Sequence, residues 1–242
     1  MARRPIVAVI AGLVVALAAG GPASPAGIAD AADAEAPVDL PAAAISLVDR
    51  VQVRVAPLAE ARRIKTMKDL RYDYRPTIFQ LIARQRNGSG EDWFQIHVPG
   101  RPNGRLGWVP AASMDVLYSV SETRIEIDRS KRRLRLIGPG GRTQLKAAVA
   151  VGTRKAPTPL GKFYVTAAFR PGDRFLGPWA FETSAYAAIT DWPRGGVVGL
   201  HGTSVPRSIG KRASHGCLRV FNRKILRLRK RVPLGTPIVI RA

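Results

Sequence analysis

Acidic residues and cysteine are both scarce in this chain. Its 242 residues include 17 Asp and Glu against 39 Lys and Arg, which gives a formal net charge of +22. An excess of this size favours an anionic partner, such as nucleic acid, a membrane surface or an acidic polymer. Cys217 is the only cysteine, so no disulfide can form within the chain.

The chain also lacks a long hydrophobic run near its start. The apolar stretch 6–19 is shorter than the roughly 20 residues that span a bilayer comfortably, and the Gly-Gly-Pro at 20–22 ends it. Because Arg3 and Arg4 precede this stretch and small residues follow it, we expect residues 1–32 to be a signal peptide. The protein is then exported to the cell envelope or secreted, and an uncleaved membrane anchor is the alternative.

Export changes the meaning of the single cysteine and of the charge. Exported chains usually hold cysteines in even numbers for disulfides, so an unpaired Cys217 is unusual. It is either a buried inert or intermolecularly paired thiol, or a reactive one. Export also makes anionic polymers of the envelope a better partner than nucleic acid, for which the chain shows no recognised motif with interleaved aromatic residues.

A first strand-rich region follows a short linker. Residues 33–44 are rich in Ala, Asp and Pro without a period, which predicts the linker. Residues 45–118 contain short strand-like runs, including VRVAP, a strand with Trp93 and a closing GWVP around Trp108. This region resembles a bacterial Src-homology-3-like domain, a small barrel that often binds cell-wall peptides. We expect both tryptophans to be structural, since aromatic residues in small barrels are usually core.

The remaining chain, 122–242, also predicts mainly β structure. Two alternating runs at 124–128 and 133–137 form an expected hairpin. Residues 171–196 are irregular and rich in aromatic residues, which indicates either core packing or a lid over a site. One convincing helix follows Asn222, which is placed to cap its start. The remaining expected strands cover 144–151, 162–168, 197–200 and 236–240.

The loop from His201 to Val220 gathers the scarce reactive side chains. It contains His201, His215 and Cys217, and a cysteine thiol needs a nearby base or positive charge to react at neutral pH. In an extended segment His215, Cys217 and Arg219 share one face, so spacing alone nominates His215 as the base. Without a Cβ at Gly216, a carbonyl can approach the amides of residues 216 and 217, an oxyanion-type donor pair.

Three readings of this loop remain open from the residues alone. Thiol, imidazole and oxyanion donors together indicate acyl transfer. His201, His215 and Cys217 could instead bind zinc, but their spacing is unlike compact zinc ligand pairs and the nearby arginines disfavour a cation. The third reading is an inert structural loop.

The sequence HGTSVPRSIG…SHGCLRV closely resembles the active-site signature of the L,D-transpeptidase catalytic domain. PTPLGKFYV is similar to an earlier segment of the same family, and the resemblance covers residues 122–242. It implies that Cys217 is the nucleophile and that His201, rather than His215, is the general base.

The resemblance also assigns the neighbouring residues. It implies that Ser214 and His215 shape the pocket and contact the substrate or the thiol, and that the amides of Gly216 and Cys217 form the oxyanion hole. The carbonyl of Gly202 is expected to orient the imidazole, and Arg219 to bind a substrate carboxylate. It implies no metal and no cofactor.

The implied activity is two-step acyl transfer on peptidoglycan stem peptides. Cys217 attacks the carbonyl before the terminal D-alanine, and an acceptor amine resolves the thioester to give a 3→3 cross-link. The alternatives are an L,D-carboxypeptidase, in which water resolves the thioester at the same site, and a non-catalytic cell-wall-binding protein. The sequence leaves the oligomeric state open.

Overall fold

Short strands separated by turns make up most of the described chain, so the expected mainly β fold is confirmed. The computed structural model describes residues 38–189 and 193–242. The expected signal peptide at 1–32 and part of the expected linker lie outside the described residues. No helix within the described ranges is both long and apolar enough to cross a membrane.

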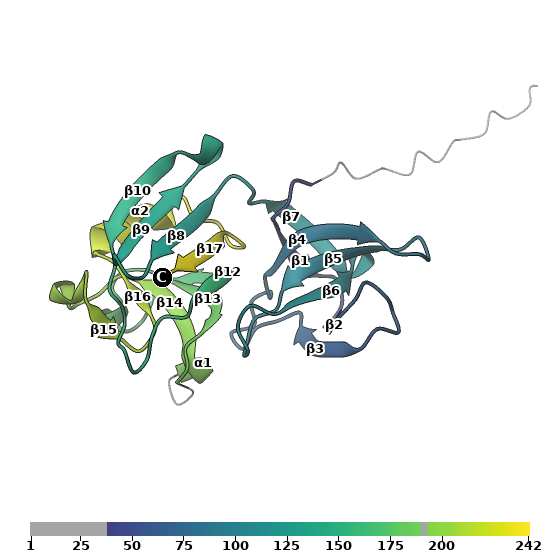
Figure 1. Cartoon of the computed structure of the whole chain (residues 1–242), viewed down its shortest axis with the longest axis horizontal. Coiled ribbons are helices and arrows are strands. Elements are labelled where there is room, and N and C mark those ends of the chain that lie inside the picture. The colour runs from purple at the N-terminus through teal and green to yellow at the C-terminus, as the bar shows by residue number, and fades with distance from the viewer. Residues whose placement is uncertain (1–37, 190–192) are drawn as a thin grey trace, which may run out of the picture. The chain divides into compact units, whose positions relative to one another are not determined.

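The N-terminal half of the described chain forms a seven-stranded sheet (Figure 1). Its spatial order is β3-β2-β6-β5-β4-β1-β7. A hairpin joins β4 and β5, and in its turn the side-chain oxygen of Asn87 accepts hydrogen bonds from the amides of Ser89 and Glu91. The strands are β1 (Ala42–Ser46), β2 (Arg50–Arg54), β3 (Arg63–Lys68), β4 (Phe79–Arg86), β5 (Asp92–His97), β6 (Leu106–Pro110) and β7 (Met114–Ser119).

The first strand corrects the linker expected at 33–44. β1 begins at Ala42 and lies between β4 and β7, with Ala42, Ala43 and Ala44 fully buried. Alanine is small enough to let β1 pass close to another backbone: a Cβ placed on Gly235 would lie 2.7 Å from that of Ala43. The alanine run carries no periodic signal because its small side chains serve as core on both faces.

The C-terminal half forms an eight-stranded sheet with the order β10-β9-β8-β17-β12-β13-β14-β16. β8 and β9 form the expected antiparallel hairpin, whereas β17 pairs with β8 and β14 pairs with β16 in parallel. The strands are β8 (Arg124–Asp128), β9 (Arg133–Ile137), β10 (Thr143–Ala148), β12 (Gly161–Phe169), β13 (Ala180–Tyr186), β14 (Val197–His201), β16 (Leu218–Arg219) and β17 (Pro237–Arg241). A separate two-stranded ladder joins β11 (Val151–Gly152) to β15 (Arg212–Ser214).

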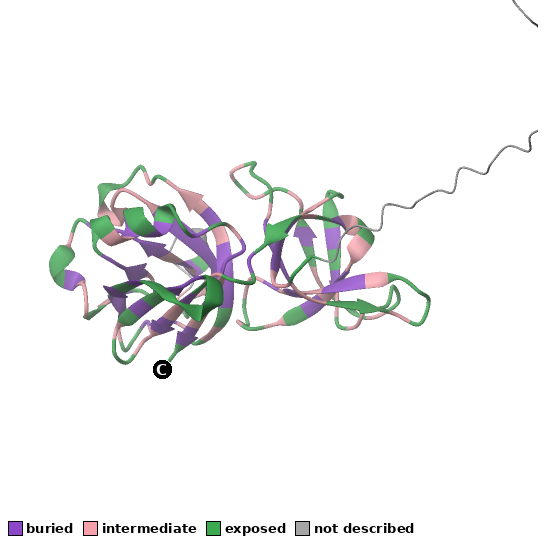
Figure 2. Cartoon of the chain, turned by 90° about the horizontal axis from the view of Figure 1, so that it is seen from above, coloured by how far each residue is buried: buried purple, intermediate pink, exposed green. Residues whose placement is uncertain are grey.

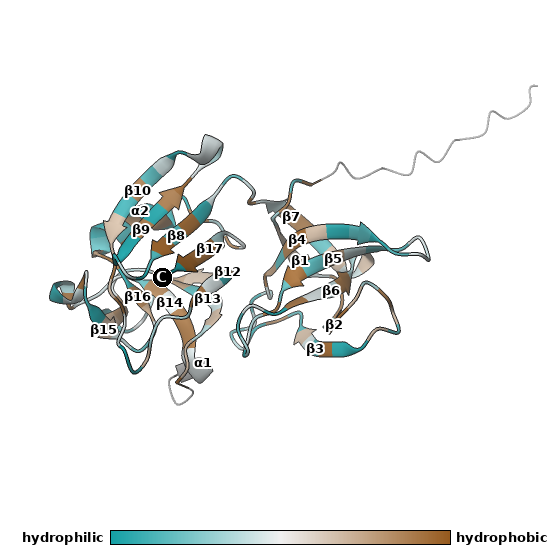
Figure 3. Ribbon diagram, in the orientation of Figure 1, coloured by the Kyte–Doolittle hydropathy of each residue, from teal (hydrophilic) through white to brown (hydrophobic). Residues whose placement is uncertain are grey.

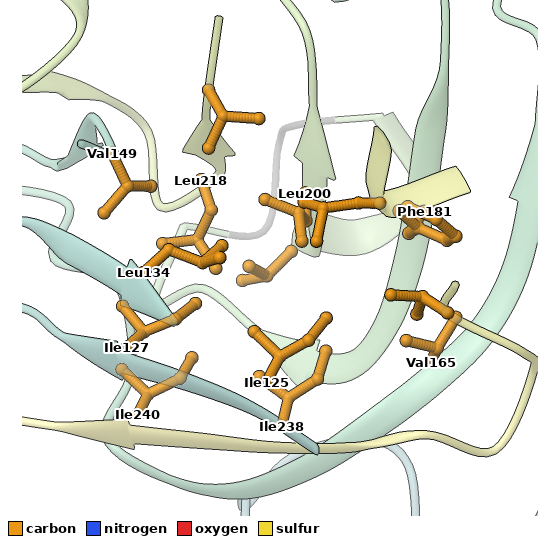
Figure 4. Packing of buried hydrophobic residues seen from close by; sticks show 14 of the residues in the cluster. Ile125, Ile127, Leu134, Val149, Val165, Phe181, Leu200, Leu218, Ile238 and Ile240 are labelled. Atoms are coloured by element: carbon orange, nitrogen blue, oxygen red, sulfur yellow. The ribbon is translucent and has the colours of Figure 1, made fainter. Parts of the chain in front are cut away.

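The alternating strands of this sheet bury one continuous apolar cluster. Ile125 and Ile127 of β8 and Ile238 and Ile240 of β17 pack toward Leu200 of β14, as Figure 4 shows. Figure 3 shows β17 as largely hydrophobic and β8 as a mixture of hydrophobic and hydrophilic residues, and Figure 2 shows that the buried residues lie mainly on the strands. Burial of this cluster holds β14 and β16 in a fixed register.

The aromatic segment 171–196 contains a strand that the sequence did not predict. β13 pairs with both β12 and β14, and its residues are buried up to Ala185. A strand buried on both faces does not alternate, so its sequence AFETSAY gives no period-2 signal. The irregular part is limited to the ends of the segment. These include the 3-10 helix η3 (Arg174–Leu176) and the short helix α1 (Pro193–Gly196).

The predicted helix is α2 (Asn222–Arg229), but its start differs from the prediction. Phe221 occupies the N-cap position, and no side chain caps the helix. The side-chain oxygen of Asn222 instead accepts a 2.8 Å hydrogen bond from the amide of Thr203. The asparagine therefore fastens α2 to the chain that leaves His201, a long-range role that capping statistics do not reveal.

Pro37–Ala242 forms one compact unit, in which the two large sheets are in contact. The fully buried Tyr164 of β12 donates a 3.0 Å hydrogen bond to the carbonyl of Ile78. The Arg71 guanidinium contacts the Glu182 carboxylate of β13 at 2.6 Å, and both side chains are largely buried. Burial of polar groups that are paired in this way fixes the contact between the sheets.

Candidate active site

The parallel pairing of β14 with β16 brings the two halves of the His-Gly and Ser-His-Gly-Cys signature together. The register places Leu200 opposite Leu218 and His201 opposite Arg219. Continuing this register by one residue places Gly199 opposite Cys217. Because side chains alternate along a strand, Gly199, His201, Cys217 and Arg219 share one face of the sheet, while the two leucines enter the core.

Gly199 lies between the thiol and the imidazole. Its amide donates a 3.3 Å hydrogen bond to Sγ of Cys217. A Cβ at Gly199 would lie 3.6 Å from Cδ2 of His201 and 3.8 Å from Sγ of Cys217. Gly199 was not among the expected site residues, although a glycine inside the apolar strand VVGLH is a signal of close approach by another group.

His201 is held in a single tautomer by the backbone. Its Nδ1 lies 2.6 Å from the carbonyl oxygen of Gly202. A carbonyl only accepts, so Nδ1 carries the proton and Nε2 keeps its lone pair. Burial lowers the pKa of His201 to about 4, and Arg219 adds to this, while the carbonyls of Gly202 and Leu176 act in the opposite direction. The imidazole is therefore neutral at neutral pH.

The thiol of Cys217 is also neutral at rest. Burial raises its pKa above the ordinary value of 9.0, and the Gly199 amide and the positive charge of Arg219 only partly offset this effect. The residue nevertheless remains partly exposed. A protonated, reachable thiol and an unprotonated imidazole have the protonation states that a nucleophile and its general base need before proton transfer.

A buried hydroxyl closes the turn that carries Cys217. Ser214 donates from Oγ to the carbonyl of Cys217 at 2.6 Å and accepts from the amide of Gly216 at 3.2 Å. Its exposed fraction is 1%. Ser214 is expected from the family resemblance to contact substrate, whereas here both of its hydrogen bonds are internal and shape the turn.

Thr158 supports the same turn from the Pro-Thr-Pro segment. Its hydroxyl accepts from the amide of Gly152 at 2.9 Å and donates to the carbonyl of Gly216 at 2.8 Å. Thr158 is fully buried. This segment was expected only as a similarity to the family. The contact spans 58 residues of sequence and has no local signal.

Both the backbone conformation at position 216 and the neighbouring Ala187 require a glycine there. Its φ is +117°, a conformation that favours glycine. A Cβ there would lie 2.7 Å from Cβ of Ala187. The predicted pair of oxyanion donors is therefore only half available: the Gly216 amide bonds to Ser214, while the Cys217 amide has no acceptor among the described residues.

His215, which spacing alone nominates as the base, is exposed, whereas Ser214 and Gly216 on either side of it are buried. The φ of Gly216 is positive, so the chain turns between His215 and Cys217. The described ranges contain no group of three or more His, Cys, Asp or Glu side chains placed to bind a metal. The β14–β16 register places His201 on the same face of the sheet as Cys217.

Arg219 extends the site beyond the histidine. Its guanidinium stacks over the ring of Phe175 at 4.7 Å from the ring centroid, and its exposed fraction is 8%. Its buried Nε has no hydrogen-bond partner among the described residues. Arg219 therefore places a positive charge beside His201 and Cys217, which suits an anionic group of a substrate.

The segment around η3 forms one wall of the site. A Cβ on Gly177 would lie 2.6 Å from the amide nitrogen of Thr203, and the Gly202 amide donates to the carbonyl of Trp179 at 3.2 Å. This close packing brings Leu176 to His201 and Phe175 to Arg219. The sequence indicated a lid or core here, and this part is packed directly beside His201.

Known proteins are similar to the part of the chain that contains this site. Residues 122–240 match the family model YkuD, described as the L,D-transpeptidase catalytic domain, which confirms the resemblance over these residues. Two Bacillus proteins named as L,D-transpeptidase YkuD are similar. That of B. subtilis is 36% identical over 93 residues, covering 38% of this chain and 50% of the relative. That of B. licheniformis is 35% identical over 118 residues, covering 48% and 64%.

A solved structure of Enterococcus faecium L,D-transpeptidase also matches. It has a TM-score of 0.40 and 23% identity, and the match covers 50% of each chain. The chain thus spans between half and two thirds of the length of these curated relatives, and about half of this solved chain.

Proposed function

Because residues 122–240 match the L,D-transpeptidase catalytic domain, we propose that this chain is a peptidoglycan L,D-transpeptidase that uses Cys217 as its nucleophile. One observation carries the proposal. The β14–β16 register puts His201 and Cys217 on one face of the sheet, with only Gly199 between them. This arrangement supplies a thiol, a base and an open approach for a carbonyl group.

The first step is formation of a thioester. Nε2 of His201 takes the Cys217 proton as Sγ attacks the carbonyl that links the third stem residue to the terminal D-alanine. The S–C bond forms, the C–N bond breaks, and the proton passes to the departing D-alanine amine. The neutral states of both side chains support proton transfer during attack rather than a preformed ion pair.

The second step resolves the thioester. An acceptor side-chain amine attacks the thioester carbon, a new C–N bond forms and the C–S bond breaks. His201 takes a proton from the amine, and the thiolate regains one. The product is a 3→3 cross-link, and no cofactor is consumed because the thioester retains the energy of the broken peptide bond.

Two donors are assigned to charge that develops on the substrate. The Cys217 amide is the oxyanion donor on the cysteine side of the turn, and Ser214 and Thr158 hold this turn in place. Arg219 binds a carboxylate of the stem peptide through the positive charge of its guanidinium. Exposed His215 contributes to the rim of the pocket.

We assign the rest of the chain to export of the protein and to its binding at the cell envelope. We take residues 45–118 as a Src-homology-3-like domain, residues 1–32 as an export signal, and anionic envelope polymers as the partners of the basic surface. The net charge of +22 supports the last assignment. The location that follows is the cell envelope.

The test is incubation of the protein and a Cys217→Ala variant with purified disaccharide-tetrapeptides, followed by mass analysis of the products. Dimers that have lost one D-alanine establish a transpeptidase. Shortened monomers establish an L,D-carboxypeptidase at the same site. The absence of any product that depends on Cys217 overturns both and leaves a non-catalytic wall-binding protein.

A further inference from the structure

Two side chains of the loop between β5 and β6 form hydrogen bonds with the backbone at the end of β13 and just after it. Asn103 donates from Nδ2 to the carbonyl of Tyr186 at 2.7 Å, and its Oδ1 accepts from the Tyr186 amide at 3.0 Å. These are the two hydrogen bonds that a neighbouring strand would make to one residue. The side chain of Asn103 thus replaces a strand partner at the end of β13.

Arg101 of the same loop holds the next residues. Its Nε donates to the carbonyl of Ala187 at 3.1 Å, its Nη2 also reaches this oxygen, and Nη2 donates to the carbonyl of Ile189 at 3.0 Å. The guanidinium lies over the ring of Tyr186, 5.2 Å from the ring centroid. Together Arg101 and Asn103 contact the backbone of three of the four residues 186–189.

This backbone segment packs directly on the turn that carries the nucleophile. Ala187 is buried, and its Cβ occupies the space that a Cβ on Gly216 would need. Gly216 in turn is tied to Ser214 on one side and bonded covalently to Cys217 on the other. A shift of Ala187 therefore changes the position of the Cys217 amide, the available oxyanion donor.

Arg101 and Asn103 both lie outside the part of the chain that matches the catalytic domain, which begins at residue 122. We propose that Arg101 and Asn103, from the N-terminal sheet, are positioning residues that set the Gly216–Cys217 turn through Ala187. The expected effect on catalysis rests on the proposed function, whereas the expected effect on the position of the turn does not. The N-terminal sheet then completes the active site in addition to any role in wall binding.

The test compares the full chain with Asn103→Ala and Arg101→Met. Hydrogen exchange at the Gly216 and Cys217 amides reports the position of the turn without any assay of activity. We expect exchange to become about tenfold faster in both variants, and the rate constant for acylation by a carbapenem to fall about tenfold or more, since small misplacements of reacting groups are costly. Arg101→Lys keeps one donor for Ala187 and gives intermediate values for both.

Two matched controls separate positioning from loss of stability. Asn87→Ala removes an asparagine that also bonds backbone amides, but in the β4–β5 hairpin. Arg86→Met removes an exposed arginine of the same sheet that pairs with Asp92. Both are expected to leave exchange and acylation within about twofold of the unmodified protein.

Unchanged exchange at Gly216 and Cys217 in Arg101→Met and in folded Asn103→Ala overturns the proposal, as does an equal effect in the controls. If Asn103→Ala does not fold, Arg101→Met and Arg101→Lys decide. Failure of the unmodified protein to react with a carbapenem counts against the proposed function alone, because the exchange measurement still tests the positioning.

Discussion

The amide of Gly199 donates a hydrogen bond to Sγ of Cys217, and the missing side chain of the same glycine leaves the sulfur open to approach. One residue thus provides a backbone donor to the nucleophile and the space in front of it. This double use depends on the parallel register of β14 and β16, which sets Gly199 opposite Cys217.

Gly199→Ala is expected to reduce acylation without unfolding the protein. The added methyl group meets its neighbours at 3.5 to 3.8 Å, which is ordinary van der Waals contact, but it occupies the approach to Sγ. Acylation by a carbapenem should fall about tenfold or more, since a few displaced atoms in a fitted site cost this much. Gly172→Ala, at a position with no neighbour within 4 Å, is the control; equal acylation rates in the two variants would contradict the role of Gly199.

The pH dependence of alkylation distinguishes a neutral pair from an ion pair. Because the pKa of Cys217 is raised above 9.0 and that of His201 is lowered to about 4, both groups are uncharged between these values. Alkylation of Cys217 by iodoacetamide should therefore be slow at pH 7 and rise with the thiol pKa above pH 9. A plateau of rapid alkylation beginning near pH 5 would indicate a thiolate–imidazolium pair instead.

The free energy of unfolding should depend on pH because the pKa of His201 is lowered in the folded state. Burial favours neutral His201 in the folded state, so the unfolded chain binds the extra proton between its ordinary pKa of 6.5 and about 4. Stability should fall as the pH drops through this window, by roughly 3 kcal/mol in total at about 1.4 kcal/mol per pKa unit. Denaturant unfolding at several pH values measures the effect, and His201→Asn should flatten it; an unchanged slope would show that other groups are responsible.

Thr158→Val should weaken both the fold and the reaction. It leaves the buried amide of Gly152 and the buried carbonyl of Gly216 without partners, at a cost of about 1–3 kcal/mol for each group. Thr158→Ser keeps the hydroxyl and should restore most of the loss. Thr236→Val is the matched control, because Thr236 is equally buried and bonds a backbone carbonyl, that of Pro233. If it lowers acylation as much as Thr158→Val, stability alone explains the result.

Gly216→Ala should be more damaging than its backbone strain alone predicts. A positive φ costs an alanine roughly 1–2 kcal/mol, and here the new Cβ also meets Ala187. Gly210→Ala has a positive φ with no neighbour within 4 Å, so it measures the strain without the clash. In thermal unfolding the loss should be larger for Gly216→Ala, and adding Ala187→Gly should recover the difference. No recovery would mean that Ala187 does not press on the turn.

The chemistry of the site was predictable because its reactive residues lie within one short stretch. The family signature identifies Cys217 and His201, and alternation along an extended chain explains why spacing alone points to His215. Gly216, between His215 and Cys217, has a positive φ that turns the chain. A glycine marks such a turn in the sequence, but its dihedral angles are set by contacts with Ala187 and Thr158, far away in the chain.

The fold shows the same division between local and distant causes. The β8–β9 hairpin and α2 were predicted because their signals are local. β1 and β13 were not, since both are buried strands without alternation and their partners fix them. The hydrogen bonds from Arg101 and Asn103 to the backbone of Tyr186 and Ala187 have no sequence signature. Exposed arginines and asparagines in turns are common in proteins and do not indicate such contacts.

The burial that keeps Cys217 protonated has a consequence for its chemical lifetime. Peroxides attack thiolates, and each oxidation step from sulfenic acid onward begins from that ionised form. In the proposed mechanism Cys217 is stored as a thiol and is ionised only when His201 withdraws its proton during attack on a carbonyl, so it spends little time as the vulnerable species. A raised thiol pKa would then protect Cys217 against oxidation in the absence of substrate.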